Sequence, residues 1–244
     1  MYLVDIYPST GGIISLAFGV MNWNLRECIV RFRSMCDEAF SPRDWLGIPG
    51  IKQIAAWKHA SKYKTKPFYS VLQRNFGRAN LFGARRADST GYGPKVAVTA
   101  TDEAGKKAIV LANYNRIDRT RNNRRKPTHE FPRPDNPKLE LKVWEAAAAT
   151  SAAPTYFKPF EHKSNNRTYL DGALYNNNPV KIIQRERKLL WPDVAGKHPD
   201  ILLSIGTGQN EDAIRRDLPE RGSRSKHRWV LCVVHCHSDV YFLD

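Results

Sequence analysis

The sequence predicts an α/β fold of three layers, with helices on both faces of a mostly parallel central sheet. Three observations predict this class. Strand-like and helix-like segments alternate along the chain. The segments 108–112 and 201–205 are apolar almost throughout, as strands buried on both faces are. A sharp turn at 9–12 joins the first strand to a wholly apolar, hence buried, helix. One domain is expected over 1–209, followed by an irregular, charged segment at 210–244.

The N-terminal elements follow from local patterns. Residues 2–7 are expected to form a strand and 13–20 a buried helix. A second helix is expected after Asn24, because Asn24 and Glu27 have the spacing of a capping box. Its apolar residues repeat with helical periodicity, which places both Cys28 and Cys36 in the core.

The remaining elements are expected further along the chain. Short helices and turns are expected over 46–94. Asn178 is expected to cap a helix that runs to about Leu190. The other expected elements are strands at 95–100, 108–112, 168–170 and 201–205, a turn at 102–105, and a helix at 139–149.

Composition limits the classes of partner. Lys and Arg number 39 against 24 Asp and Glu, so the net charge is +15. Such a charge favours an anionic phospholipid surface or a nucleic acid. A basic run lies at Arg116, Arg119, Arg121, Arg124, Arg125 and Lys126. Such a run is usually a solvated surface. No signature of a nucleic-acid-binding fold accompanies it, so if it binds a partner, a membrane surface is expected.

The expected location is the cytoplasm, with peripheral attachment to membranes. The longest apolar stretch, 13–21, is too short to span a bilayer. Four cysteines without a secretory signal are typical of free thiols. No cofactor or metal is expected.

Ser9 is the candidate nucleophile. A strand, then a turn containing Ser9, Thr10 and Gly11, then a buried helix is the arrangement of a nucleophile elbow. The helix N-terminus favours negative charge, and the backbone N–H of Thr10 is the expected oxyanion donor. An ordinary strand-to-helix turn with a capping serine also explains this segment taken alone.

Asp171 is the candidate base. It follows a short apolar strand, where partial desolvation makes a carboxylate a better proton acceptor. Gly172 allows a tight turn beside it. An ordinary Asp-Gly turn is the alternative.

The two segments, in this order, resemble the patatin family. The resemblance is supported by WEAAAATSAAPTYF at 144–157, YLDGALYNNNPV at 169–180 and ILLSIGTG at 201–208. It extends from about Val4 to Gln209 and implies a patatin-like fold that hydrolyses phospholipids or related lipid esters. It also implies a Ser–Asp dyad without histidine. Ser9 would be the nucleophile and Asp171 the general base, with Gly11, Gly172 and Ala173 in the two motifs.

The sequence departs from the family pattern at its N-terminal side. Tyr7 stands where G-x-S-x-G has its first glycine, and it should crowd the turn. Pro8 restricts Tyr7 to extended conformations. Only eight residues precede Ser9, too few for the family's glycine-rich oxyanion loop and its strand. We therefore expect a fold that lacks its first strand and a chain that hydrolyses esters poorly.

Other interpretations remain open. A catalytically impaired member would bind lipid or a protein partner, and a basic nucleic-acid-binding protein is less favoured. A conventional triad would recruit His198 or His227, although neither lies in a motif. No chemistry is assigned to Thr150 or Ser151, which are expected to pack beside the site. Two further clusters are expected to hold no metal or phosphate: Cys232, His235, Cys236 and His237, and the glycines Gly83, Gly91 and Gly93.

Overall fold

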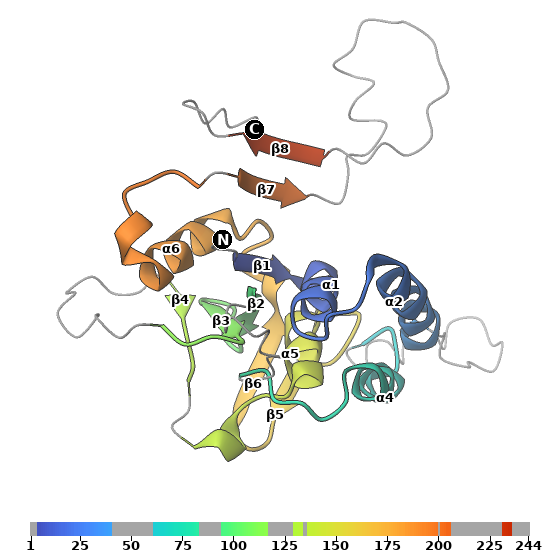
Figure 1. The fold of residues 1–244 in the computed structure, drawn as a ribbon. Coiled ribbons are helices and arrows are strands. Elements are labelled where there is room, and N and C mark those ends of the chain that lie inside the picture. Colours follow the sequence, from blue (N-terminus) through green and yellow to red (C-terminus); the bar gives the residue numbers. More distant parts are fainter. Residues whose placement is uncertain are drawn as a thin grey trace, which may run out of the picture. The chain divides into compact units, whose positions relative to one another are not determined.

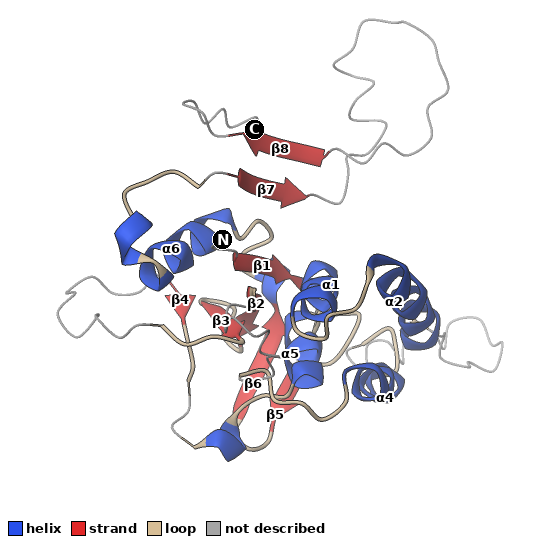
Figure 2. Ribbon diagram, viewed as in Figure 1, coloured by secondary structure: helices blue, strands red, loops and turns tan. Residues whose placement is uncertain are grey.

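The computed structural model describes residues 4–40, 61–82, 94–116, 129–133, 136–199, 201–205 and 231–235. They fall in two compact units, Met1–Leu190 and Trp191–Asp244, each with its own sheet (Figures 1 and 2). Several sequence-based expectations concern positions outside the described residues. These are the basic run from Arg119 to Lys126, the glycines Gly83, Gly91 and Gly93, His227, Cys236 and His237.

The first unit is built on a six-stranded sheet. Its strands are ordered β4-β3-β2-β6-β5, and β1 also pairs with β2. The central strand β2 is buried over most of its length. The strand bounds are β1 Val4–Pro8, β2 Lys95–Asp102, β3 Ala108–Ala112, β4 His129–Glu130, β5 Phe160–His162 and β6 Arg167–Asp171.

The expectation of a mostly parallel sheet is wrong. The pairs β1/β2 and β3/β4 are parallel, but β2/β3, β2/β6 and β5/β6 are antiparallel. For β2/β3 and β5/β6 the reason is local, because each pair is a hairpin of consecutive strands. In the first, the N–H of Gly105 donates to the carbonyl of Asp102 at 2.9 Å. Short turns can join only antiparallel neighbours, whereas parallel ones need a long crossover.

Within the described ranges, four helices contribute to the first hydrophobic core. They are α1 Ser9–Gly19, α2 Leu25–Ala39, α4 Thr65–Phe76 and α5 Val143–Thr150. Helices α1 and α5 contact β2, and α2 and α4 pack beside them. Leu16 of α1, Val98 of β2 and Ala146 of α5 are fully buried in this core. An added Cβ at Gly12 would lie 3.0 Å from both Val98 and Thr150, so glycine allows α1 to approach the sheet closely.

Helix α6, Val180–Leu190, covers the other face of the sheet. Strand alternation turns Ala97 and Val110 away from the first core, and both are buried. Ile182 and Leu190 are the buried apolar residues of α6. Figure 1 shows α1 and α5 on one side of the strands and α6 on the other. The three-layer α/β class is therefore confirmed for this unit.

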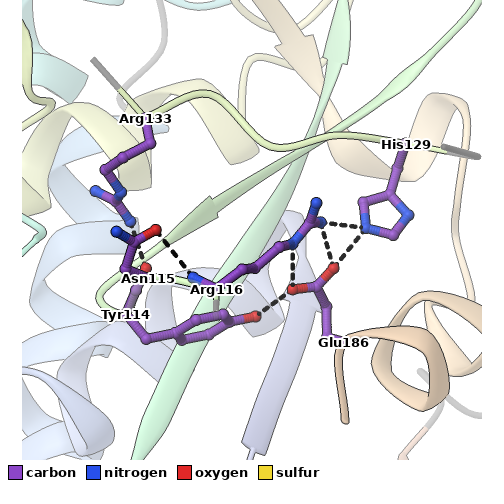
Figure 3. A network of polar contacts seen from close by, with 6 residues as sticks. All are labelled: Tyr114, Asn115, Arg116, His129, Arg133 and Glu186. Carbon is purple, nitrogen blue, oxygen red and sulfur yellow. Dashed lines mark hydrogen bonds and ion pairs between the residues drawn. The ribbon is translucent and has the colours of Figure 1, made fainter. Parts of the chain in front are cut away.

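A buried ionic cluster attaches α6 to the sheet (Figure 3). Glu186 is fully buried, and its carboxylate accepts hydrogen bonds from the Tyr114 hydroxyl at 3.1 Å and from the Arg116 guanidinium. The His129 ring nitrogen Nε2 lies 2.6 Å from the same carboxylate. Arg116 also stacks on Phe131, 4.0 Å from the ring centroid. Several donors therefore compensate the buried charge.

Local signals define most helix ends. The N–H of Glu27 donates to the Asn24 side chain at 2.9 Å, and that of Val180 donates to the Asn178 side chain at 3.2 Å. Both expected caps are confirmed. The helix expected at 139–149 instead begins at Val143, after a separate 3₁₀ turn at Pro137–Leu139. The twelve-residue α4 is longer than the short helices expected in that region.

The second unit contains the short 3₁₀ helix Pro192–Val194 and the strands β7 Ile201–Ile205 and β8 Leu231–His235. The expected strand at 201–205 is confirmed, but it pairs antiparallel with β8, with Ile201 opposite His235. A domain extending to residue 209 stays a prediction. Throughout the described ranges, no helix combines the length and apolarity needed to cross a membrane.

Candidate active site

Two strands meet end to end along one edge of β2. Strand β1 runs parallel to β2 and ends with Pro8 opposite Thr99. Strand β6 runs antiparallel and ends with Asp171 opposite Ala100, the next residue of β2. The residue after β1 is Ser9. The pairing register therefore brings Ser9 and Asp171 together, although 162 positions separate them.

Ser9 lies at a sharp turn between β1 and α1. Its φ of 50° is in the left-handed region, which non-glycine residues rarely adopt. Its backbone N–H donates to Thr150 Oγ1 at 2.9 Å. The expected crowding by Tyr7 is relieved at Gly11, where an added Cβ would lie 3.3 Å from the Tyr7 Cβ. A bare Cα at Gly11 therefore makes room for the tyrosine.

Hydrogen bonds to both its side chain and its backbone hold Asp171 in place. Its Oδ2 accepts from the Ser9 hydroxyl at 2.7 Å and its Oδ1 from the N–H of Ala173 at 2.8 Å. Its carbonyl accepts from the Thr101 hydroxyl at 2.8 Å, and its N–H donates to the Ala152 carbonyl at 3.0 Å. Burial raises the pKa of this carboxyl, and the hydrogen bonds from Ala173 and Ser9 only partly offset that rise. The carboxylate is thus more basic than an ordinary aspartate.

Gly172 is required by a close backbone contact. A Cβ at this position would lie 2.1 Å from the carbonyl oxygen of Thr99, which is impossible without movement. The turn after Asp171 therefore packs directly on β2, and only glycine fits there. This contact explains the Asp-Gly pair physically.

The end of α5 lies beside both candidate residues, as expected for Thr150 and Ser151, and makes hydrogen bonds to both that no local pattern predicts. Thr150 holds the N–H of Ser9, and Ala152 holds the N–H of Asp171. Thr150 Oγ1 in turn donates to the Thr99 carbonyl at 2.7 Å. The available signal was a run of small polar residues at the end of an alanine-rich helix. That pattern indicates close packing beside the site but does not show which backbone groups these residues contact.

An apolar cavity of about 360 Å³ opens beside Ser9. Helices α1, α2 and α4 and the segment after α5 supply its walls. Their lining residues are Ser9, Thr10, Ile13, Phe32, Met35, Cys36, Ala39, Phe40, Phe68, Leu72, Ser151, Ala153, Tyr156 and Phe157. A lining of this kind accommodates a hydrocarbon chain and leaves few polar groups near the serine.

The N-terminus of α1 provides backbone donors at the cavity. The N–H of Thr10 belongs to the first helical turn and has no intrahelical acceptor. Thr10 and Ser9 line the same cavity, and the N–H groups of a first helical turn favour a bound anion. The N–H of Ser9 is engaged by Thr150.

The histidines of the alternative Ser–Asp–His triad and the residues of the possible metal cluster belong to the second unit. His198 is exposed there, whereas the carboxylate of Asp171 is hydrogen-bonded to Ser9 and Ala173 in the first unit. For Cys232 and His235 the backbone of β8 is described but the side chains are not. The described residues contain no cluster of three metal-ligating side chains.

Comparison with known proteins adds independent information. Residues 9–183 match the family model for patatin-like phospholipase. Calcium-independent phospholipase A2-gamma of Homo sapiens is 30% identical over 224 residues, which are 89% of this chain and 25% of that protein. The 85/88 kDa calcium-independent phospholipase A2 of Rattus norvegicus is 29% identical over 211 residues, 83% of this chain and 22% of that protein.

A bacterial relative is also similar. The cGAMP-activated phospholipase of Escherichia coli (strain TW11681) is 36% identical over 116 residues, 44% of this chain and 30% of that protein. The chain thus spans about a quarter of the length of the mammalian relatives it matches. The family model covers more than half of the chain and includes Ser9, Asp171 and both motif glycines. The chain therefore belongs to the patatin-like phospholipase family.

Proposed function

We propose that this protein is a serine acyl-ester hydrolase that acts on phospholipids or related lipids through a dyad of Ser9 and Asp171. One observation carries the proposal. The Ser9 hydroxyl donates to a buried carboxylate at 2.7 Å, at the wall of an apolar cavity. A nucleophile, a base within hydrogen-bond reach and a site for an acyl chain are thereby combined.

The reaction has two steps. Ser9 Oγ attacks the ester carbonyl carbon while its proton passes to Asp171 Oδ2, and the carbonyl oxygen becomes an oxyanion that the N–H of Thr10 stabilises. The C–O bond of the ester breaks, and the leaving alcohol takes the proton from Asp171. Water then gives a proton to Asp171 and attacks the acyl carbon. Ser9 recovers that proton as the fatty acid leaves.

Peripheral binding to an anionic membrane belongs to the same proposal. On α2, Leu25 and Ile29 are 66% and 44% exposed and lie on the helical face that continues to Phe40 at the cavity. Arg26 and Arg33 are exposed beside this apolar stripe. A helix with an apolar stripe bordered by arginines suits a bilayer surface with anionic headgroups.

Covalent labelling tests the dyad most directly. The chain and its Ser9→Ala variant are treated with a fluorophosphonate, and the adduct is mapped by mass spectrometry. Hydrolysis of 4-nitrophenyl butyrate and of a phospholipid is measured in parallel. We expect an adduct on Ser9 and a turnover, even if slow, that disappears in Ser9→Ala. An intact protein without an adduct on Ser9, or hydrolysis that survives the substitution, would refute the proposal.

Vesicle binding tests the membrane part separately. The Ser9→Ala protein is sedimented with vesicles of phosphatidylcholine, with and without phosphatidylglycerol. We expect Leu25→Ser and Ile29→Ser to weaken binding to both vesicles. Arg26→Ala and Arg33→Ala should each weaken only the anionic binding, about fivefold at ~1 kcal/mol per basic residue. Ile201→Ser is the matched control, since Ile201 is 65% exposed in the second unit. Equal losses in the control would contradict the assignment.

A further inference from the structure

The hydroxyl of Ser151 is buried and unpaired at the cavity. Ser151 is 8% exposed, and its Oγ has no hydrogen-bond partner among the described residues. It lines the same cavity as Ser9. Buried hydroxyls are normally paired, because an unpaired one loses its hydrogen bonds to water without replacement. An exception inside a candidate active site points to a partner that arrives with the substrate.

Its position in the chain supports this interpretation. The preceding residue, Thr150, accepts the N–H of Ser9 at 2.9 Å, and the following residue, Ala152, accepts the N–H of Asp171 at 3.0 Å. Ser151 is thus held between the residues that position the nucleophile and the base. Its two chain neighbours are held through the side-chain oxygen of Thr150 and the carbonyl of Ala152.

Two other buried hydroxyls show what is specific to Ser151. Ser15 and Thr99 are also buried with unpaired hydroxyl oxygens, but neither lines the cavity. The lining near Ser9 is mostly apolar, so the reacting ester carbonyl is the polar group that a substrate must bring there. A serine hydroxyl is a suitable donor to a carbonyl oxygen that gains negative charge.

We propose that Ser151 Oγ donates a hydrogen bond to the carbonyl oxygen of the bound ester and that this bond strengthens as the oxyanion forms. Ser151 is then a second oxyanion donor beside the N–H of Thr10. The inference rests on the proposed hydrolase function and adds a catalytic residue to it. No proton leaves Ser151, so Asp171 remains the base in both steps.

Kinetics of three variants test the role. With 4-nitrophenyl butyrate, Ser151→Ala should lower kcat by about 100-fold with little change in KM, as loss of one oxyanion donor does. Ser151→Thr keeps the hydroxyl and should retain much of the rate. Ser15→Ala is the matched control, because it removes a buried unpaired hydroxyl outside the cavity. Its kcat should equal that of the parent chain.

Stability separates catalysis from structure. Ser151→Ala removes no protein hydrogen bond of the side chain, so its thermal midpoint should equal or exceed that of the parent chain. A fall in kcat accompanied by a matching fall in midpoint would overturn the proposal in favour of a packing role. If Ser151→Ala has the same kcat as the parent chain, the proposal is overturned as well.

A trifluoromethyl ketone provides a readout that does not need turnover. Nucleophilic serines add to this carbonyl and give a hemiketal oxyanion, which fluorine NMR detects. If the parent chain forms no hemiketal, the proposed hydrolase function itself fails. If it forms one and Ser151→Ala binds the ketone equally tightly, only the role of Ser151 fails. We expect about 100-fold weaker binding in Ser151→Ala.

Discussion

Thr150 Oγ1 accepts the backbone N–H of Ser9 at 2.9 Å, although 141 positions separate the two residues. The left-handed φ of Ser9 costs ~1–3 kcal/mol and persists only when surrounding contacts hold it. The side chain of Thr150, itself anchored on the Thr99 carbonyl, is one such contact. Thr150 is therefore a positioning residue for the elbow.

Substitution of Thr150 tests this relationship. Thr150→Val keeps the shape but leaves the N–H of Ser9 and the Thr99 carbonyl without their partner. We expect kcat for 4-nitrophenyl butyrate to fall about tenfold or more, since misplaced reacting groups cost rate. Thr150→Ser retains the oxygen and should restore most of the activity. An equally inactive Thr150→Ser would show that the methyl group matters instead.

Gly172→Ala is expected to disrupt both stability and the site. The new Cβ would lie 2.1 Å from the Thr99 carbonyl, so the turn carrying Asp171 must move. We expect a loss of about 2 kcal/mol or more in the free energy of unfolding, by urea denaturation, together with loss of fluorophosphonate labelling. Gly196→Ala is the control, because nothing lies within 4 Å of its added Cβ. That control should label and unfold like the parent chain.

The pH dependence of hydrolysis should report the carboxyl of Asp171. Burial raises its pKa above 3.8, more than the hydrogen bonds from Ala173 and Ser9 lower it. The base acts only when deprotonated, so kcat/KM should fall as pH decreases through this raised pKa. A pH–rate profile that starts below the ordinary aspartate pKa, at about pH 3, and extends to about pH 8 measures it. A profile that is flat in this range would contradict the assignment of Asp171 as the base.

The raised pKa of the Asp171 carboxyl also predicts how the stability of Asp171→Asn depends on pH. A folded-state pKa above the unfolded one means that the folded protein loses stability as pH rises through this window. The neutral amide has no such loss. We therefore expect Asp171→Asn to be more stable than the parent chain at neutral pH, with the difference shrinking in acid, and to lose ~10²–10⁴ in rate. Thermal midpoints of both proteins across pH provide the comparison.

Glu186 is expected to stabilise the fold without taking part in chemistry. Burial alone would raise its pKa, but hydrogen bonds and charge from His129 and Arg116 outweigh burial and lower it. Its stabilisation is thus present above the unfolded pKa and lost as pH falls through the lowered one. Glu186→Gln should cost about 3 kcal/mol of unfolding free energy at neutral pH. The exposed Glu103→Gln serves as control, and a similar loss there would contradict the argument.

Local sequence signals determined several parts of this protein. The cap at Asn24, the strand ends near Asp171 and the turn before Gly105 all follow from residue types within a few positions. The family motifs around Ser9 and Asp171 likewise identify the chemistry to look for. These features are predictable because the interactions that form them span one turn of chain.

Only the tertiary structure decided how those parts meet. Nothing local shows that β1 and β6 share one edge of β2, and this pairing places Asp171 Oδ2 2.7 Å from the Ser9 hydroxyl. The antiparallel pairing of β7 was not predictable from the sequence either, and the sequence did not show which backbone groups Thr150 and Ala152 hold. Strand register and burial result from contacts between distant segments packed against a shared core. Residues near Ser9 in the chain therefore do not contain that information.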